Sequence, residues 1–282
     1  MKILITGAKG QLGYHLKQVF ADEELYLTDV DNLDIVNASA VERVFRFFTP
    51  ELVIHAAAYT AVDRAEDEPA KAFAVNRDGT ANLAEQARAH DIPILMISTD
   101  YVFDGKAKRP YPETVKAKPL SVYGASKLSG EEVVAKRCPK HWIVRTAWLY
   151  GGSSGHRNFV RTILELAQKT KQLNIVNDQI GSPTYTADLA QAIKTMVKKK
   201  LPYGTWHIAN SGQASWYQFA KEILRLMELK RKLRPIKSTS LKRKAVRPAF
   251  SALATDKVAA QGIKLRSWQE ALQDFLTNET KS

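Results

Sequence analysis

The sequence predicts an α/β fold, in which a doubly wound parallel sheet is followed by a smaller C-terminal lobe. Two observations support this prediction. Short apolar runs alternate with amphipathic helical patterns through the first half of the chain, as in sheets built from strand–helix–strand units. This alternation weakens after Gly151. We therefore expect residues 1–150 to form the sheet domain and residues 151–282 mainly the lobe, partly interleaved with the sheet domain.

The elements of this fold can be assigned in chain order from the apolar periodicity. Apolar runs predict strands at residues 2–6, 24–28, 52–56, 93–98 and 142–148. Apolar residues at helical spacing predict helices between these strands, at residues 10–20, 39–48, 69–89 and 123–136. In the second half, the same criteria predict a strand at 205–209 and helices at 158–169, 187–198, 216–229 and 267–276. The basic segment 230–248 has no apolar period and is expected to be an extended surface loop.

The composition is that of an ordinary globular protein from a reducing compartment. Of the 282 residues, 45% are hydrophobic and 25% are charged, which excludes a largely disordered chain. The single cysteine, Cys138, excludes an intramolecular disulfide. No apolar run reaches the length of a membrane span, and the first residues lack the long apolar region of a signal peptide. We therefore expect a cytoplasmic protein that does not enter a membrane.

The formal net charge of +13 comes entirely from the last third of the chain. Residues 191–282 contain 19 Lys and Arg against 6 Asp and Glu. A basic surface can bind phosphate backbones, but lysine-rich faces are commonly just solvated. The segment has neither zinc-finger spacing nor an aromatic RNA-binding signature. We expect no nucleic-acid partner, while a smaller polyanion such as a nucleotide diphosphate is compatible with this charge.

The segment Gly7-Ala-Lys-Gly10-Gln-Leu-Gly13 directly follows the first predicted strand and opens the first helix. Glycines at these positions permit a tight turn and close approach of a pyrophosphate to the helix N-terminus. Asp29 ends the second strand, where a carboxylate can bind the adenosine ribose hydroxyls of a dinucleotide. The sequence therefore predicts a Rossmann-type dinucleotide site. Asp29 disfavours a 2′-phosphate and Lys9 favours one, so NADH and NADPH are both candidates.

A second group of residues has the pattern of an acid–base site. Tyr123 and Lys127 are four residues apart, so their side chains share one helix face. A neighbouring ammonium favours the phenolate and makes a tyrosine a better acid–base group near neutral pH. Such a pair alone is often structural. Thr99 strengthens the functional interpretation because it follows the fourth strand, at the sheet edge where ligands bind in open α/β sheets.

Together, these motifs resemble the extended short-chain dehydrogenase/reductase family. Further similar segments are His55-Ala-Ala-Ala58, Asn76-Arg-Asp-Gly-Thr-Ala-Asn82 and Arg145-Thr-Ala-Trp-Leu-Tyr-Gly151. Within that family, the chain is most similar to the dTDP-4-dehydrorhamnose reductases. The segments that carry this narrower resemblance are Ala61-Val-Asp-Arg-Ala-Glu66, Ser98-Thr-Asp-Tyr-Val-Phe-Asp-Gly105, Asn177-Asp-Gln-Ile-Gly-Ser-Pro-Thr184 and Arg247-Pro248.

The resemblance implies a role for each matching residue. Tyr123 would donate a proton, Lys127 would assist it and bind the nicotinamide ribose, and Thr99 would polarise the reacting carbonyl. The dinucleotide would contact Tyr123, Lys127 and the residues Gly7, Gly10, Gln11, Leu12, Gly13, Asp29, Asp34, Ile35, Ala56, Ala57 and Ala58. The sugar nucleotide would contact Thr99, Asp100, Trp148 and Arg247. The implied reaction is NAD(P)H-dependent reduction of the C4 keto group of dTDP-4-dehydro-L-rhamnose to dTDP-L-rhamnose.

Two other functions stay open on the sequence. One is a sugar-nucleotide epimerase or dehydratase of the same family, which the segment Ser98–Asp104 disfavours. The other is a non-catalytic regulatory binding subunit, which the presence of Thr99, Tyr123 and Lys127 disfavours. The sequence leaves open whether the protein is a monomer or a homodimer.

Metal chemistry has little support in the sequence. The six histidines have no metal-ligand spacing, so no metal site is predicted, although carboxylates could recruit Mg²⁺. The tryptophans Trp206, Trp216 and Trp268 are expected to pack within the core or the lobe.

Overall fold

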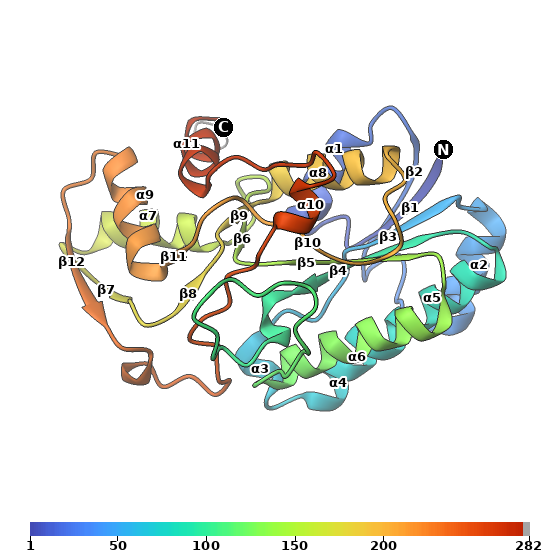
Figure 1. Cartoon of the computed structure of the whole chain (residues 1–282), viewed down its shortest axis with the longest axis horizontal. Helices are drawn as coiled ribbons and strands as arrows, with labels where there is room; N and C mark the ends of the chain where they lie inside the picture. Colours follow the sequence, from blue (N-terminus) through green and yellow to red (C-terminus); the bar gives the residue numbers. More distant parts are fainter. Residues whose placement is uncertain (279–282) are drawn as a thin grey trace.

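A six-stranded parallel sheet forms the centre of the protein (Figure 1), whose computed structural model describes residues 1–278. Its strand order is β10-β5-β4-β3-β1-β2, and every neighbouring pair is parallel. The strands are β1 (Lys2–Thr6), β2 (Glu24–Thr28), β3 (Leu52–His55), β4 (Ile94–Thr99), β5 (His141–Thr146) and β10 (Gly204–His207). The predicted doubly wound α/β fold is confirmed. The chain order reverses between β1 and β3, which is where such sheets bind ligands.

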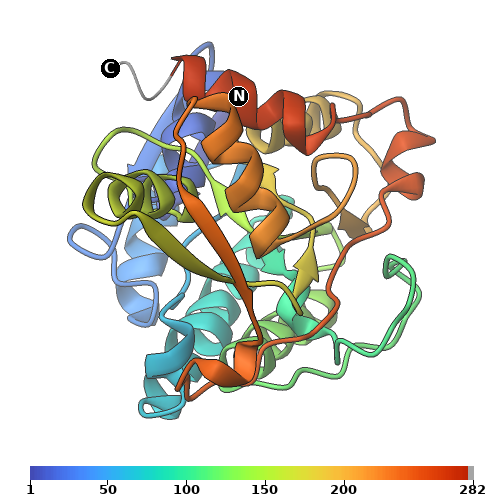
Figure 2. The same cartoon turned by 90° about the vertical axis from the view of Figure 1, so that its left-hand side faces the viewer.

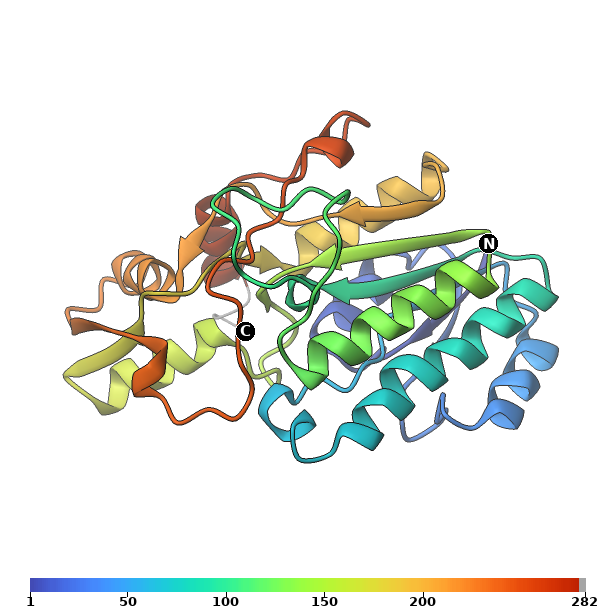
Figure 3. The same cartoon turned by 60° about the horizontal axis from the view of Figure 1, so that its bottom comes forward.

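Helices cover both faces of this sheet (Figure 3). The helices on one face are α1 (Gln11–Val19) and α8 (Thr186–Lys198), and those on the other are α2 (Ala38–Phe48), α5 (Thr80–Ala89) and α6 (Val122–Arg137). Alternate residues of β1 supply the two cores: Ile3 and Ile5 pack towards α1 and α8, and Leu4 packs towards α2 and α5. Burial on both faces explains why the central strands read as continuous apolar runs.

The helical segment predicted at residues 69–89 is continuous but not uniform. It consists of α4 (Pro69–Phe73), a π-helical segment (Ala74–Gly79) and α5. The wider π turn displaces the side chains that follow it, a feature common at functional sites. Here it buries Asn76 and brings Gly79 so close to Ile35 that a Cβ at position 79 would lie 2.6 Å from the Ile35 side chain.

The C-terminal lobe, which faces the viewer in Figure 2, has an apolar cluster of its own. It contains α7 (Phe159–Lys169), β7 (Gln172–Val176), α9 (Trp216–Leu226), β12 (Lys232–Ile236) and α11 (Trp268–Asn278). The remaining short elements are α3 (Val62–Ala65), β6 (Leu149–Tyr150), β8 (Ile180–Gly181), β9 (Thr184–Tyr185), β11 (Ala214–Ser215), α10 (Asp256–Ala259) and the 3₁₀ turns Asp100–Val102 and Ser238–Ser240. No helix within residues 1–278 is both long and apolar enough to cross a membrane.

The expectation that residues 230–248 form an extended loop is wrong for residues 232–236. These residues form β12, which pairs in parallel with β7 and aligns Leu233 with Leu173. Leu233 packs against the lobe cluster while Arg234 is exposed. Pro235 is tolerated because β12 has only one partner strand, as is typical of edge strands. The pairing depends on a distant strand, so the periodicity of the segment itself could not reveal it.

The lobe and the sheet domain are not two consecutive segments of the chain. Helix α8 and strand β10 follow residue 150, yet both pack into the sheet domain: Leu189, Ile193 and Met196 of α8 contact the core that Ile3 and Ile5 form. Strand β10 then extends the sheet beyond β5.

Candidate active site

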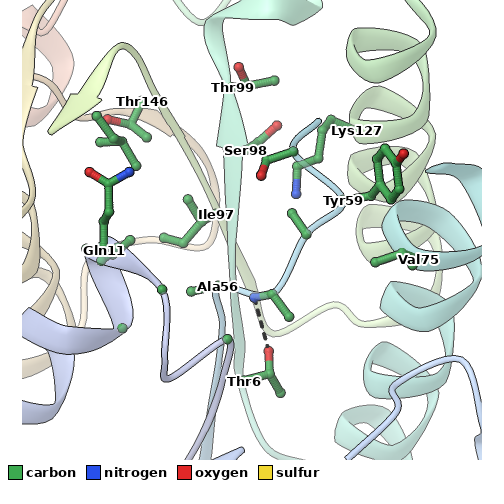
Figure 4. Close-up of a pocket in the computed structure, with 18 of the residues that line it drawn as sticks. Thr6, Gln11, Ala56, Tyr59, Val75, Ile97, Ser98, Thr99, Lys127 and Thr146 are labelled. Carbon is green, nitrogen blue, oxygen red and sulfur yellow. Dashed lines mark hydrogen bonds between the residues drawn. The ribbon is translucent and has the colours of Figure 1, made fainter. Parts of the chain in front are cut away.

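A cleft of about 880 Å³ opens at the carboxyl ends of β1, β3, β4 and β5 (Figure 4). It extends from the glycine-rich turn at one end to Trp148 and Trp216 at the other. The cleft brings together sixteen of the residues predicted from the sequence: Gly7, Gly10, Gln11, Leu12, Gly13, Asp29, Asp34, Ile35, Ala56, Ala57, Ala58, Thr99, Asp100, Tyr123, Lys127 and Trp148.

The glycine-rich turn has the geometry of a phosphate cradle. Gly7 adopts the left-handed backbone conformation (φ 71°), which disfavours residues with a side chain. A Cβ on Gly13 would lie 2.2 Å from the carbonyl oxygen of Gly7, so only glycine permits this close packing. Gly10 is the N-cap residue of α1, and it has no side chain to bind the first turn of the helix. The backbone N–H groups of that turn are therefore available to an anion. The turn therefore fits the pyrophosphate of a dinucleotide.

Two buried acceptors in the cleft have no partner among the described residues. The Gln11 side chain donates through Nε2 to the Arg157 carbonyl at 3.3 Å, but its Oε1 accepts no hydrogen bond. The hydroxyl of Thr146, at the end of β5, also has no hydrogen-bond partner. Buried polar groups are rarely left unpaired, so these atoms indicate that a polar ligand completes the site. Thr146 was not predicted from the sequence.

Asp29 lines the cleft beside the glycine-rich turn, where its carboxylate already holds two backbone groups. Oδ2 accepts from the Lys9 amide and Oδ1 from the Val30 amide, both at 2.9 Å. The ammonium of Lys9 is paired with Asp31 at 2.5 Å on the exposed rim. One carboxylate and one nearby ammonium thus lie together at this end of the cleft.

Thr99, Tyr123 and Lys127 meet at the other wall of the cleft. Thr99 ends β4, and its hydroxyl donates to Asp100 Oδ1 at 3.1 Å. Tyr123 is the second residue of α6, which Ser121 caps by accepting from the Gly124 amide at 3.2 Å. Lys127 follows one turn later and is only 2% exposed. The helix therefore presents the phenol and the ammonium to the same side.

Burial controls the protonation of this wall. It lowers the pKa of Lys127 to about 8, although the nearby carboxylate of Glu131 favours the ammonium. It raises the pKa of Tyr123 far above its ordinary value, so the phenol keeps its proton. The expectation that Lys127 brings this phenol closer to ionisation at neutral pH is therefore wrong for the structure described here, because burial outweighs the effect of the ammonium. Burial also raises the pKa of Asp100 to about 7, against the hydrogen bonds from Ser251 and Thr99. The two oxygens of Asp100 accept hydrogen bonds from the Thr99 and Ser251 hydroxyls.

A buried ion pair between Glu131 and Arg145 lies next to Lys127. Glu131 lies one turn after Lys127 on α6, and Arg145 of β5 binds it through Nη2–Oε2 at 2.6 Å and Nε–Oε1 at 2.9 Å. Ser98 of β4 donates to the same carboxylate at 2.5 Å. The pair fixes α6 against the sheet. Sequence reasoning missed Glu131, although its spacing of four from Lys127 continues the same helix face.

Trp148 forms the far end of the cleft in an unusual backbone conformation. Its φ is +48°, a left-handed value that is rare for a bulky residue and common where structure is held for function. The indole is stacked on Trp216 of α9, with ring centroids 3.5 Å apart and nearly parallel planes. Its edge packs on Gly181, where a Cβ would lie 2.4 Å from the ring. Trp206 and Trp268 are buried as expected, whereas Trp216 lines the cleft.

Arg247 is the one predicted site residue outside the cleft lining. Its guanidinium binds Asp63 through Nη2–Oδ2 at 2.7 Å and Nη1–Oδ1 at 3.0 Å. The same segment is held by Lys244, whose ammonium binds Asp67 at 2.6 Å. These pairs tie residues 244–247 to the start of the segment that leads into α4. The role of Arg247 as a substrate ligand stays a prediction.

The described residues contain no group of three or more His, Cys, Asp or Glu side chains placed to hold a metal ion. The site is a cleft of about 880 Å³ with a threonine, a tyrosine and a lysine on one wall.

The chain is similar to known proteins over nearly its full length. A dTDP-4-dehydrorhamnose reductase from Sinorhizobium fredii is 40% identical to this chain, over 96% of this chain and 95% of the relative. The crystal structure of a dTDP-4-dehydrorhamnose reductase from Clostridium acetobutylicum superposes with a TM-score of 0.94 at 42% identity, covering 98% of this chain and 99% of the other. The enzyme of that name from Bacillus anthracis, solved in complex with NADP, gives a TM-score of 0.94 at 38% identity and 98% coverage of each chain.

Residues 1–281 also match the family described as the RmlD substrate binding domain. With this match over nearly the full length, the chain belongs to that family.

Proposed function

We propose that the protein uses NADPH or NADH to reduce the C4 keto group of dTDP-4-dehydro-L-rhamnose, giving dTDP-L-rhamnose. The observation that carries this proposal is the common wall formed by Thr99, Tyr123 and Lys127, which faces the same cleft as the glycine-rich turn. The relatives named dTDP-4-dehydrorhamnose reductase support the choice of substrate.

The dinucleotide would be held by the turn Gly7–Gly13, by Asp29 at the adenosine ribose and by the loop 56–58 at its middle. Gln11 Oε1 and Thr146 Oγ1 supply buried polar partners further along the cleft. When bound, this cofactor supplies the hydride for the sugar carbon. The protein contributes a preorganised anion site, because its N–H groups and glycines are already in place.

The residues of the catalytic wall act on the carbonyl oxygen. Tyr123 holds a proton that it can deliver to the oxygen as negative charge develops there. Lys127 places a positive charge behind the phenol and stabilises the phenolate that remains. Thr99 donates to Asp100 in the described structure, and by turning its hydroxyl to the carbonyl it would polarise the substrate.

The sugar nucleotide would lie between this wall and Trp148, so that the C-terminal lobe closes the substrate end of the cleft. The lobe supplies Trp216 and Gly181 around Trp148. We propose that this reaction takes place in the cytoplasm.

The test is to add dTDP-4-dehydro-L-rhamnose, generated in place, to the purified protein with NADPH or NADH. We expect one reduced nicotinamide to be oxidised for each sugar nucleotide consumed, and the product to be the 6-deoxy-L-sugar nucleotide. Conversion of the sugar without net cofactor oxidation would instead identify an epimerase. Binding without conversion would identify a non-catalytic subunit. Tyr123→Phe serves as the inactive control.

A further inference from the structure

His55 lies at the end of β3, one residue before the loop 56–58 that lines the cleft, and its side chain is fully buried. Both ring nitrogens have a hydroxyl partner. Nδ1 lies 2.8 Å from Thr6 Oγ1, and Nε2 lies 2.9 Å from Thr80 Oγ1. The histidine therefore bridges β1 and α5 beneath the cofactor end of the cleft.

The hydrogen bonds around His55 fix its tautomer. The hydroxyl of Thr80 donates its single proton to the Asn76 carbonyl at 2.8 Å, so towards the histidine it can only accept. Nε2 must then carry the proton, and Nδ1 accepts from Thr6. The surroundings keep this ring neutral, because burial and the charge of Lys127 lower its pKa to about 3.

The two ends of this chain of bonds reach opposite walls of the cleft. At one end, Thr6 Oγ1 points to the loop 56–58 and accepts from the Ala57 amide at 3.4 Å (Figure 4). At the other end, Asn76 donates through Nδ2 to Ser126 Oγ at 2.9 Å. Ser126 lies on α6 and donates in turn to the carbonyl of Tyr123 at 2.8 Å.

Asn76 strengthens the connection because its side chain also binds the backbone of Tyr59, at the end of the loop 56–59. Its Oδ1 accepts from the Tyr59 amide at 2.8 Å, and its Nδ2 donates to the Tyr59 carbonyl at 3.1 Å. The π-helical segment Ala74–Gly79 is what presents Asn76 to both the loop and α6. Every donor in this series of hydrogen bonds, from the Ala57 amide to the Tyr123 carbonyl, has an acceptor. No single group could exchange its donor and acceptor roles without breaking a bond to its neighbour.

We infer that His55 is a positioning residue, which as the neutral Nε2–H tautomer sets the loop 56–59 at a fixed distance from the helix that carries Tyr123 and Lys127. This inference rests on the proposed function, because the loop borders the cofactor and the helix carries the proton donor. Hydride and proton transfer to one carbonyl need both walls in register, and a misplacement of about 1 Å can cost a large part of the rate.

The first test reads the tautomer directly and needs no substrate. Protein labelled with ¹⁵N-histidine is examined by long-range ¹H–¹⁵N NMR at neutral pH, and His55→Phe assigns the resonances by their loss. We expect a protonated Nε2 and an unprotonated Nδ1 at His55. A protonated Nδ1, or a mixture of the two forms in fast exchange, would overturn the inference. A wrong assignment of the sugar substrate leaves this test unaffected.

The second test separates positioning from simple packing through Thr80. Thr80→Val keeps the volume but removes the hydroxyl, and Thr80→Ser restores it. The matched control is Thr195→Val on α8, since the Thr195 hydroxyl also donates to the carbonyl four residues earlier, at 2.9 Å, but reaches no histidine.

We expect Thr80→Val to lower kcat by roughly tenfold with little change in the KM for the sugar nucleotide, and to shift the His55 resonances away from the single tautomer. Thr80→Ser should recover both. Thr195→Val should match the wild type. Wild-type kcat in both Thr80→Val and His55→Phe, or an equal loss in Thr195→Val, would overturn the inference.

Discussion

A lysine that is 2% exposed stands one helical turn from the tyrosine it is proposed to assist. Isolated ammonium groups are costly to bury, and here the carboxylate of Glu131 and the open cleft are what sustain the charge. Tyr123 is shifted the other way, towards its protonated form. At the scale of single residues, burial therefore keeps the phenol protonated and brings the titration of the ammonium close to neutral pH.

The role of Tyr123 can be tested by removing only its hydroxyl. Tyr123→Phe keeps the ring, which packs edge-on against Tyr101, but loses the proton donor. We expect kcat to fall by about 10²–10⁴-fold while the affinity for the reduced cofactor is retained. Steady-state kinetics and cofactor fluorescence titration measure the two quantities. A variant that turns over at the wild-type rate would remove Tyr123 from the mechanism.

The lowered pKa of Lys127 predicts a pH limit to activity. A lysine whose pKa is about 8 is charged below that pH and becomes neutral as the pH rises through it. Because the charge stabilises the phenolate, kcat/KM should decline above pH of about 8. The measurement is the pH profile of kcat/KM at saturating cofactor. A profile that stays level up to the ordinary lysine pKa of about 10.4 would contradict this account.

Asp29 should decide the preference between the two cofactors. Asp29→Ala removes an acceptor for the adenosine ribose and an anion that repels a 2′-phosphate, so NADH should lose more affinity than NADPH. Titration of both cofactors into wild type and variant gives the two ratios. Asp29 also holds the Lys9 and Val30 amides. An equal loss for both cofactors would therefore assign it to the turn alone.

At the scale of elements, the contact between α9 and the end of β5 joins the lobe to the cleft. Trp216 is the first residue of α9, and its capping box (Ser215 with Gln218) fixes where that helix begins. The helix start thereby holds the indole of Trp148 in place, despite the left-handed backbone beneath it.

Removing this stack should impair the substrate end of the cleft selectively. An aromatic pair contributes roughly 0.5–1.5 kcal/mol beyond its buried area, so Trp216→Ala should raise the KM for the sugar nucleotide by about 2- to 13-fold. Trp216→Phe should recover most of the loss, and cofactor affinity should not change. The paired measurement is KM for substrate against Kd for cofactor. Equal losses in both would point to general unfolding of the lobe instead.

The sequence predicted those elements that their own apolar pattern marks, and it failed where only the pairing with a distant segment defines the element. β1, β2 and α6 were predicted within a residue or two, because apolar runs and helical spacing mark them locally. β12 was missed because only its pairing with β7 makes it a strand. The same distinction holds in the site: the glycine-rich turn is local, whereas the stacking of Trp216 on Trp148 joins residues 68 positions apart.

At the scale of the whole molecule, buried titratable groups predict how stability depends on pH. Burial lowers the pKa values of His55 and His207 to about 3 and raises that of Asp100 to about 7. Between about pH 4.5 and 6 the unfolded chain therefore protonates both histidines, while the folded chain protonates only Asp100. The unfolded state binds one more proton, so stability falls as the pH is lowered.

The expected slope is about 1.4 kcal/mol of unfolding free energy for each pH unit in this range. Urea unfolding at several pH values measures it. Asp100→Asn removes the opposing group, so the slope should rise to about 2.7 kcal/mol per unit. If stability in the variant depended on pH no more steeply than in the wild type, Asp100 would not be protonated in the fold.

Because α8 and β10 follow residue 150 but pack into the sheet domain, the sheet can be completed only late in synthesis. A ribosome releases β1 to β5 well before α8 and β10, which cover the apolar face around Ile3, Ile5 and Trp142 and complete the sheet. Until α8 and β10 have emerged, α1 is the helix that covers that face, the contacts of α8 are missing and β5 is an unpaired edge, the kind of surface that recruits other chains. A nascent chain stalled before α8 should therefore engage a holdase chaperone, and one stalled after β10 should be released from it.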